Sequence, residues 1–191
     1  MASKRRLGPR NSEISQAILD ATEVVMREEG YGAVSSRRIA QVAGVQQGLV
    51  YYYFETMDEL LLATFQRRVA RRLDRYKEYA RAEHTISSIW QDFNRNLDGR
   101  MSFEFVALAN HHEGIRAELV RFLTESRRLQ ASVIAKEAPD TGVELNSISP
   151  TALAFLIHCA NLVMSREAAI GVTEGHDEVR ALFTELIEKL G

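Results

Sequence analysis

Amide and glycine residues between positions 44 and 48 have the types and spacing for contact with DNA bases. Gln46 and Gln47 follow Gly44, and a glutamine amide can form a pair of hydrogen bonds with the edge of an adenine. Gly48 has no side chain, so the backbone can approach a ligand closely at this position. We therefore expect Gln46 and Gln47 to contact bases from the N-terminus of a short helix, with Gly48 close to the DNA.

Hydroxyl and cationic side chains flank these amides and suit contacts with phosphate groups. Ser35 and Ser36 stand at the expected start of another helix, where hydroxyls and free backbone N–H groups bind phosphate. Arg37 has two candidate partners, a guanine edge or a phosphate, and we favour the base. Tyr52 and Tyr53 can donate their hydroxyls to phosphates or stack on sugars.

Two short helices joined at a glycine must position these residues. Apolar residues recur at helical spacing just before Gly44, and a second helix is expected over about 46–52. A helix over about 12–29 precedes them and ends at Gly30, which is expected in a left-handed conformation. Two helices joined in this way form a helix-turn-helix, whose second helix can enter the major groove. An αα-hairpin without a ligand has the same spacing and stays as the alternative.

Basic residues are concentrated at the start of the chain, although the net charge is −2. Lys4, Arg5, Arg6 and Arg10 occur among the first residues with no acidic residue between them. A basic end on a mildly acidic chain suits a protein that contacts an anion with that end. We expect this arm to follow the DNA backbone or to enter the minor groove. A disordered tail without a function is the alternative.

Composition argues against an exported or membrane protein. Cys159 is the only cysteine, so no intrachain disulfide can form. No apolar run is long enough for a membrane-spanning helix, and the basic N-terminus lacks the apolar segment of a secretory signal. We therefore expect a cytoplasmic protein with no membrane partner.

Sequence motifs for catalysis or metal binding are absent. No G-x-S-x-G, H-E-x-x-H or glycine-rich phosphate loop occurs in the chain. His111, His112 and Glu113 are consecutive, and consecutive positions do not share one face of a helix. We therefore expect no enzyme activity, no metal site and no cofactor.

The whole chain is predicted to be helical, because it has only three prolines and few alternating β-branched residues. Thr56 and Glu59 form a capping box that predicts the start of a long helix ending near Arg81. Ser149 before Pro150 predicts another helix start. Further helices are expected over about 86–97, 103–110, 113–137, 150–170 and 177–190. The predicted fold class is all-α with about nine helices, divided into a flexible basic arm (1–11), a three-helix DNA-binding domain (12–55) and a helical effector-binding and dimerisation domain (56–191).

Residues 14–63 resemble the DNA-binding domain of the TetR family of transcriptional regulators. The resemblance implies a helix-turn-helix regulator whose C-terminal body is also helical. It further implies that Tyr51 and Phe54 lie partly in the core, with the Tyr51 hydroxyl reaching a phosphate. The residues that match the family pattern are Ile18, Ala21, Gly30, Tyr31, Ser35, Arg37, Ile39, Ala40, Ala43, Gly44, Val45, Gly48, Tyr51, Tyr52, Phe54, Asp58, Glu59 and Leu60.

Three positions depart from the pattern of this family. Gln46 stands where a serine usually caps the recognition helix, and glutamine is a poor cap. Met57 stands where a lysine usually contacts DNA or caps the preceding helix, which puts one phosphate contact per subunit in doubt. Leu49 is apolar where a polar residue is frequent, which suits contact with a thymine methyl or packing alone.

Dimerisation is expected because one helix-turn-helix contacts only a few base pairs, so useful specificity requires two half-sites. The two C-terminal helices offer the best surface, and the resemblance implies that they form a four-helix bundle with those of a second subunit. The alternative is that this apolar stripe packs within one subunit. The expected interface residues are Leu153, Ile157, Ala160, Met164, Ala168, Leu182, Phe183 and Leu186.

Aromatic and polar residues in the middle of the chain suit a pocket for a small, largely apolar effector. For each residue taken singly, His158 included, core packing is the preferred interpretation. The arginines between 67 and 81 are expected to form a solvated face with acidic partners. The candidate effector residues are Trp90, Phe93, Asn94, Phe103, Phe105, His111, Phe122, Phe155 and His158.

The expected function is a repressor that binds a palindromic operator in double-stranded DNA as a homodimer. Effector binding is expected to shift the helix over 56–81, which continues into the DNA-binding unit, so that DNA affinity falls. A helical adaptor that has lost DNA binding is one alternative, which Met57 favours slightly. An activator is the other.

Overall fold

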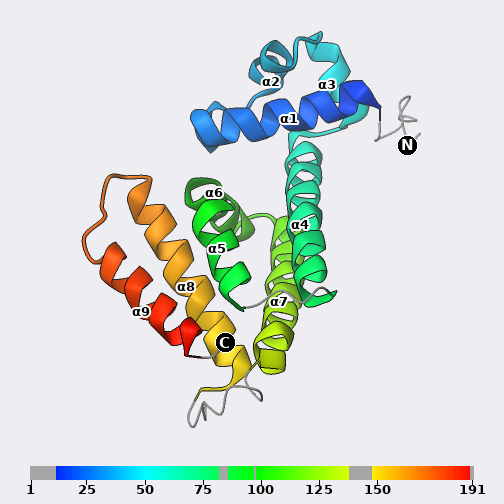
Figure 1. The fold of residues 1–191 in the computed structure, drawn as a ribbon. Coiled ribbons are helices and arrows are strands. Elements are labelled where there is room, and N and C mark those ends of the chain that lie inside the picture. Colours follow the sequence, from blue (N-terminus) through cyan, green and yellow to red (C-terminus); the bar gives the residue numbers. More distant parts are fainter. Residues whose placement is uncertain (1–11, 82–85, 97, 138–147, 190–191) are drawn as a thin grey trace. The chain divides into compact units, whose positions relative to one another are not determined.

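The computed structural model describes residues 12–81, 86–96, 98–137 and 148–189, and these residues form nine α-helices and one short 3-10 helix (Figure 1). The predicted all-α fold class is therefore confirmed. The elements are α1 (Glu13–Glu28), η1 (Tyr31–Ala33), α2 (Ser36–Ala43), α3 (Gln47–Tyr53), α4 (Met57–Arg81), α5 (Ile86–Asn96), α6 (Gly99–Ala109), α7 (Glu113–Glu137), α8 (Pro150–Ala168) and α9 (His176–Glu188).

These helices belong to two compact units. The first unit contains the described residues up to Arg68 together with Glu104–Glu118, and the second contains the described residues of Val69–Phe103 and those from Leu119 onwards. Helices α4, α6 and α7 each contribute residues to both units. The predicted boundary at residue 55 divides the chain by expected function and not by compact units, and it stays a prediction.

In the first unit, α2 packs against α1 and α3, and the start of α4 closes the same core. The buried side chains come from all four helices at helical spacing, as the apolar pattern predicts. Half-buried apolar residues, including Val45 and Met57, cover the edge of this core. The central buried residues are Ile18, Leu19, Ile39, Val50, Phe54 and Leu60.

Local sequence signals fix the ends of these helices. The hydroxyl of Ser12 accepts a hydrogen bond from the backbone N–H of Ser15 at 3.2 Å, and Ser35 caps α2 through the N–H of Arg38 at 3.3 Å. Thr56 accepts from the N–H of Glu59 at 3.0 Å, as the capping box predicts.

One glycine near these helix ends departs from expectation. Gly30 has the expected positive φ of 84°, but its ψ of 170° is extended rather than left-handed helical. The region is essentially limited to glycine, so the residue type is still required.

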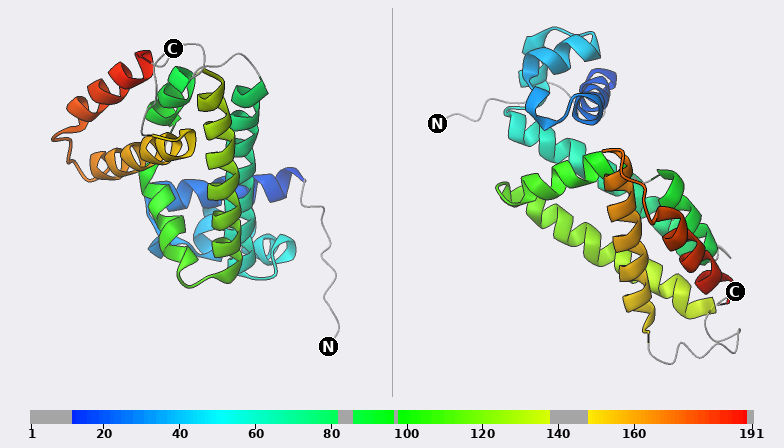
Figure 2. Two further views of the ribbon diagram at one scale, coloured as in Figure 1. Left: turned by 90° about the horizontal axis from the view of Figure 1, so that it is seen from below. Right: turned by 90° about the vertical axis from the view of Figure 1, so that its left-hand side faces the viewer.

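In the second unit, α5 lies against both α8 and α9, and α9 also contacts α8 (Figure 2). The ring of Trp90 on α5 stacks on that of Phe183 on α9, with centroids 5.0 Å apart and planes 28° apart. Tyr76 of α4 is fully buried in this unit. The hydroxyl of Ser149 caps α8 through the N–H of Ala152 at 3.1 Å, as predicted.

Helix α6 begins at Gly99, about four residues before the predicted start, because Asp98 caps it there. The Asp98 carboxylate accepts a hydrogen bond from the N–H of Met101 at 3.0 Å. The next residue, Gly99, donates its N–H to the Ser165 hydroxyl at 2.8 Å. A Cβ at Gly99 would lie 2.5 Å from the backbone carbon of Ser165, so only glycine permits this approach.

None of the helices in the described ranges is both long and apolar enough to cross a membrane.

Candidate DNA-binding site

The turn between α2 and α3 sets the direction in which the second helix leaves the first. Gly44 adopts a left-handed conformation, with φ 67° and ψ 29°, at the end of α2. The N–H of Val45 then bonds to the carbonyl of Ala40 at 3.0 Å, and the Val45 side chain packs against the core of the first unit. The turn is thus held at both its backbone and its side chain.

Gln46 precedes α3 in the cap position, and its side chain makes no capping hydrogen bond. The expectation that glutamine would cap poorly is therefore confirmed. Gln46, Gln47 and Gly48 are all exposed at this helix end. A Cβ at Gly48 would meet no atom within 4 Å, so the packing of the protein itself does not require glycine there.

The amide of Gln47 is bonded across the turn to α2. Its Nε2 donates a hydrogen bond to the Ser36 hydroxyl oxygen at 2.8 Å. Ser36, expected at the DNA backbone, retains only 7% of its surface exposed, whereas its neighbour Ser35 is exposed. The structure therefore brings two of the predicted contact residues together.

Two adjacent arginines on α2 have different surroundings. Arg38 forms a forked ion pair with Glu29, with Nε 3.0 Å from each carboxylate oxygen and Nη2 2.7 Å from one of them. The Arg38 guanidinium holds the pKa of the Glu29 carboxyl below its usual value. Arg37 is exposed, and its side chain forms no hydrogen bond or ion pair with any part of the chain that the structure describes. Arg37, unlike Arg38, is therefore free to contact another molecule.

The three tyrosines of α3 face in different directions from those expected. Tyr51, predicted to lie partly in the core with its hydroxyl toward a phosphate, is 50% exposed. Tyr53, predicted to face phosphate, is only 8% exposed and belongs to the core of the first unit. Tyr52 is half-buried and meets the Tyr53 ring edge-on, with centroids 5.0 Å apart. The seven-residue α3 thus turns its first and third tyrosines to opposite sides.

The four arm residues Lys4, Arg5, Arg6 and Arg10 lie outside the described residues. Met57, at the first position of α4, is half-buried against the core rather than facing outward as a cation would.

The sequence and the fold both match known regulators. Residues 18–64 match the family model described as bacterial regulatory proteins, tetR family. Residues 18–64 therefore belong to the TetR family. A curated relative, the fatty acid metabolism regulator protein of Bacillus subtilis (strain 168), is 33% identical over 61 residues, covering 32% of this chain. The matched part is 31% of that relative, so the chain covers about a third of its length.

Solved structures of regulators share the fold of this chain over most of its length. The reduced form of NemR from E. coli has a TM-score of 0.75 at 17% identity, covering 92% of this chain and 97% of its own. A TetR transcription regulator from Haloarcula marismortui ATCC 43049 has a TM-score of 0.70 at 20% identity, with 92% and 97% covered. FadR from Bacillus subtilis in complex with stearoyl-CoA has a TM-score of 0.60 at 17% identity, with 92% and 96% covered.

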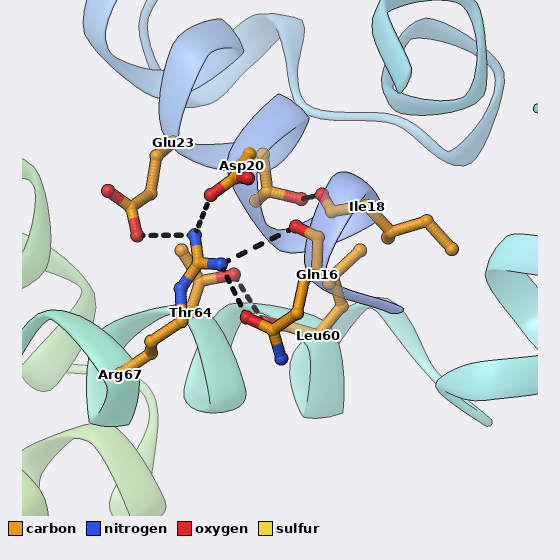
Figure 3. A network of polar contacts seen from close by, with 8 residues as sticks. Gln16, Ile18, Asp20, Glu23, Leu60, Thr64 and Arg67 are labelled. Carbon is orange, nitrogen blue, oxygen red and sulfur yellow. Dashed lines mark hydrogen bonds and ion pairs between the residues drawn. The ribbon is translucent and has the colours of Figure 1, made fainter. Parts of the chain in front are cut away.

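In the first unit, one arginine of α4 binds three side chains in the middle of α1 (Figure 3). The Nη2 of Arg67 lies 2.7 Å from carboxylate oxygens of both Asp20 and Glu23. Its Nη1 donates to the side-chain oxygen of Gln16 at 3.0 Å. The expectation of a solvated arginine face is wrong here, because Arg67 is mostly buried. Sequence reasoning missed this contact, since its partners are about fifty residues away and no local pattern links them.

The candidate effector residues are divided between the two units. Phe105 and His111 belong to the first unit, where Phe105 is buried and stacks on Phe65 with centroids 4.5 Å apart, while His111 is exposed. The core alternative is correct for Phe105. The side chain of Phe93 lies outside the part of the chain that the structure describes. The other six belong to the second unit: Trp90, Asn94, Phe103, Phe122, Phe155 and His158.

Two of these six, Trp90 and Asn94, line one pocket between α5 and α9, with a volume of about 260 Å³. Trp90 and Ile187 supply its apolar wall. The remaining lining residues carry hydroxyl, amide or charged groups and are Ser87, Gln91, Asn94, Arg95, Thr184 and Glu188. The pocket combines an apolar surface with several hydrogen-bonding groups.

His158 lies in a positively charged part of the second unit. Burial, with the nearby Arg72 and Arg127 guanidiniums, lowers its pKa to about 4. Arg72 is buried, and its Nε donates to the Tyr76 hydroxyl at 2.9 Å. Arg127 lies over the ring of Phe155, 4.8 Å from its centroid. His158 is thus neutral near pH 7.

The residues of α8 that were expected at the dimer interface differ in burial. Leu153, Ile157 and Met164 are buried within the subunit, so the packing alternative is correct for these three. The exposed apolar residues of α8 include Leu156 and Val163, which are separated by two helical turns. Of the other predicted interface residues, Ala168 and Leu182 are exposed, and Ala160, Phe183 and Leu186 are half-buried.

Proposed function

We propose that this chain is a ligand-responsive transcriptional repressor that binds a palindromic operator as a homodimer. The observation that carries the proposal is the exposed start of α3, where Gln46, Gln47 and Gly48 project from a core that fixes the turn. Glutamine amides at a helix N-terminus are suited to base edges in the major groove.

The surrounding residues support DNA as the partner. Arg37 on α2 is exposed without a protein partner among the described residues, and Tyr51 presents a phenol to solvent. Arginine and tyrosine are frequent donors to phosphates, and arginine also pairs with guanine. We assign base contacts to Arg37, Gln46 and Gln47, and phosphate contacts to Ser35, Tyr51 and Tyr52. The buried positions of Ser36 and Tyr53 remove both from the phosphate-binding set.

Dimerisation through α8 and α9 is supported by the apolar residues that these helices expose. Leu156, Cys159, Ala160 and Val163 fall on one face of α8, and we call them the α8 stripe. Leu156 and Val163 are exposed, and the two stripe residues between them are half-buried. Leu182 of α9 is 63% exposed. Two copies of such a surface would bury each other in a two-fold dimer, which places two recognition helices on one duplex.

The pocket between α5 and α9 supports a small effector with an apolar part and several hydrogen-bonding groups. Its volume is near the lower limit for drug-sized ligand sites. Effector binding would bias α4, which runs from the second unit into the first, and Arg67 would transmit that change to α1. A coupling of about 1–3 kcal/mol is typical of such switches.

Selection from a duplex library with a randomised central region tests this function. The full-length protein is incubated with the library, and bound DNA is sequenced after several rounds. The expected result is an enriched inverted repeat whose affinity falls steeply with salt. Bound DNA with no enriched sequence, or a single unrepeated site, would overturn the proposal of a dimeric repressor.

A further inference from the structure

We propose that Ser36 is a specificity-determining residue, because its hydroxyl fixes how the Gln47 amide meets a base pair. The proposal rests on the DNA-binding function above and deepens it. The direct observation is the 2.8 Å hydrogen bond from Gln47 Nε2 to Ser36 Oγ, which joins α3 to the first residue of α2. Ser36 then acts through Gln47 and is a positioning residue.

The positions of the two residues make this bond a stable part of the site. Ser36 is almost buried, so its hydroxyl cannot rotate freely into solvent. Gln47 is exposed, and an exposed glutamine without such a bond would occupy many rotamers. Fixing the side chain before DNA arrives reduces the entropy that binding must remove.

The hydrogen-bonding groups that remain on Gln47 determine which base fits. A glutamine amide has two N–H donors and one oxygen that accepts. Ser36 takes one donor, so one N–H and the oxygen are left for DNA. Adenine presents an N7 acceptor and an N6 donor in the major groove, which matches this pair.

Guanine does not match, because its N7 and O6 are both acceptors and require two donors. With one N–H held by Ser36, Gln47 cannot supply both. The serine therefore selects adenine over guanine at one position of each half-site. Loss of the hydroxyl would release the second N–H and make guanine acceptable.

The neighbouring Ser35 provides a matched control. Its hydroxyl caps α2 through the N–H of Arg38 and forms no hydrogen bond with Gln47. Ser35→Ala should weaken the helix cap and lower affinity for all sequences alike. Ser36→Thr keeps a hydroxyl and should keep the preference for adenine.

The test compares the base preferences of the full-length wild type and five variants by sequencing selected duplexes. The variants are Ser36→Ala, Ser36→Thr, the control Ser35→Ala, Gln47→Ala and the Ser36→Ala/Gln47→Ala double variant. Gln47→Ala should abolish the base preference at one position of each half-site. At that position the wild type should prefer adenine over guanine about tenfold. Ser36→Ala should reduce that ratio to about twofold and leave other positions unchanged, and the double variant should equal Gln47→Ala. Thermal unfolding of each variant verifies that it is folded.

Three results would overturn the inference. They are an unchanged profile in Ser36→Ala, a uniform loss at every position, and a wild-type preference for guanine at the Gln47 position. If wild type enriches no sequence, the DNA-binding function itself fails. A wild type that enriches an operator while Ser36→Ala retains its full preference refutes only the role of Ser36.

Discussion

Arg67 of α4 and Glu23 of α1 form an ion pair at 2.7 Å, in which both side chains are largely buried. Glu23 has 12% of its side chain exposed, whereas the second carboxylate partner of Arg67, Asp20, has 65% exposed. The pair connects the long helix α4 to α1 within the first unit (Figure 3). The two carboxylates should therefore contribute unequally.

Substitution of Arg67 by alanine should lower the free energy of unfolding by about 1–3 kcal/mol, because it leaves the buried Glu23 without its cation. Asp20→Ala is the matched control and should cost less than about 1 kcal/mol, since its partner contact is solvated. Urea unfolding of both variants measures the difference. Equal losses in the two variants would show that burial does not govern this contact.

Arg37→Ala should weaken operator binding more than Arg38→Ala does. Arg37 has no partner among the described residues, whereas Arg38 is held by Glu29. A lost guanine contact costs about 1–3 kcal/mol at one base position, and a lost phosphate contact lowers the salt slope by about one per subunit. Fluorescence anisotropy over a salt series separates these outcomes. A larger loss from Arg38→Ala would contradict the assignment.

Stability should fall as pH drops from 6.5 to 4 because of His158. Its pKa in the folded protein is lowered from 6.5 to about 4, so the unfolded chain binds a proton in this window while the folded chain does not. The loss between pH 7 and pH 5 should be about 2 kcal/mol. His158→Gln should remove this part of the pH dependence in urea unfolding curves. The same slope in the variant would show that other groups cause it.

Val163→Asp should dissociate the proposed dimer, because it places a charge on the α8 stripe. Val163 is 49% exposed in the single chain, so the substitution should leave the fold of the subunit intact. Thr151→Asp adds the same charge to an exposed position of the same helix and serves as the control. Sedimentation velocity should show monomers for the first variant and dimers for the second. A dimeric Val163→Asp would place the interface elsewhere.

Sequence reasoning located most helices because their signals are local. The caps at Ser12, Ser35, Thr56 and Ser149 and the glycine at Gly44 each act within a few residues. These signals also placed the start of α3 and its exposed amides.

The missed features depend on contacts between distant residues. The helical pattern did not show which tyrosine of α3 would be buried, because Tyr51 and Tyr53 are the same residue type. Only the packing of α3 against α1 and α2 determines that Tyr53 is buried and Tyr51 is exposed. Ser36 and Gln47 meet only across the turn, and Arg67 meets α1 only in the folded unit. The α8 stripe shows the same limit, because an apolar helix does not indicate which face its own subunit covers.

The central claim is that the exposed start of α3 binds a specific DNA sequence, and the affinity for a selected duplex against a scrambled one tests it most directly. We predict that the wild-type protein binds the selected duplex at least about a thousandfold more tightly than the scrambled duplex. The logarithm of its association constant should fall linearly with the logarithm of the salt concentration. Equal affinity for the two duplexes, or an affinity that salt does not change, would contradict the account.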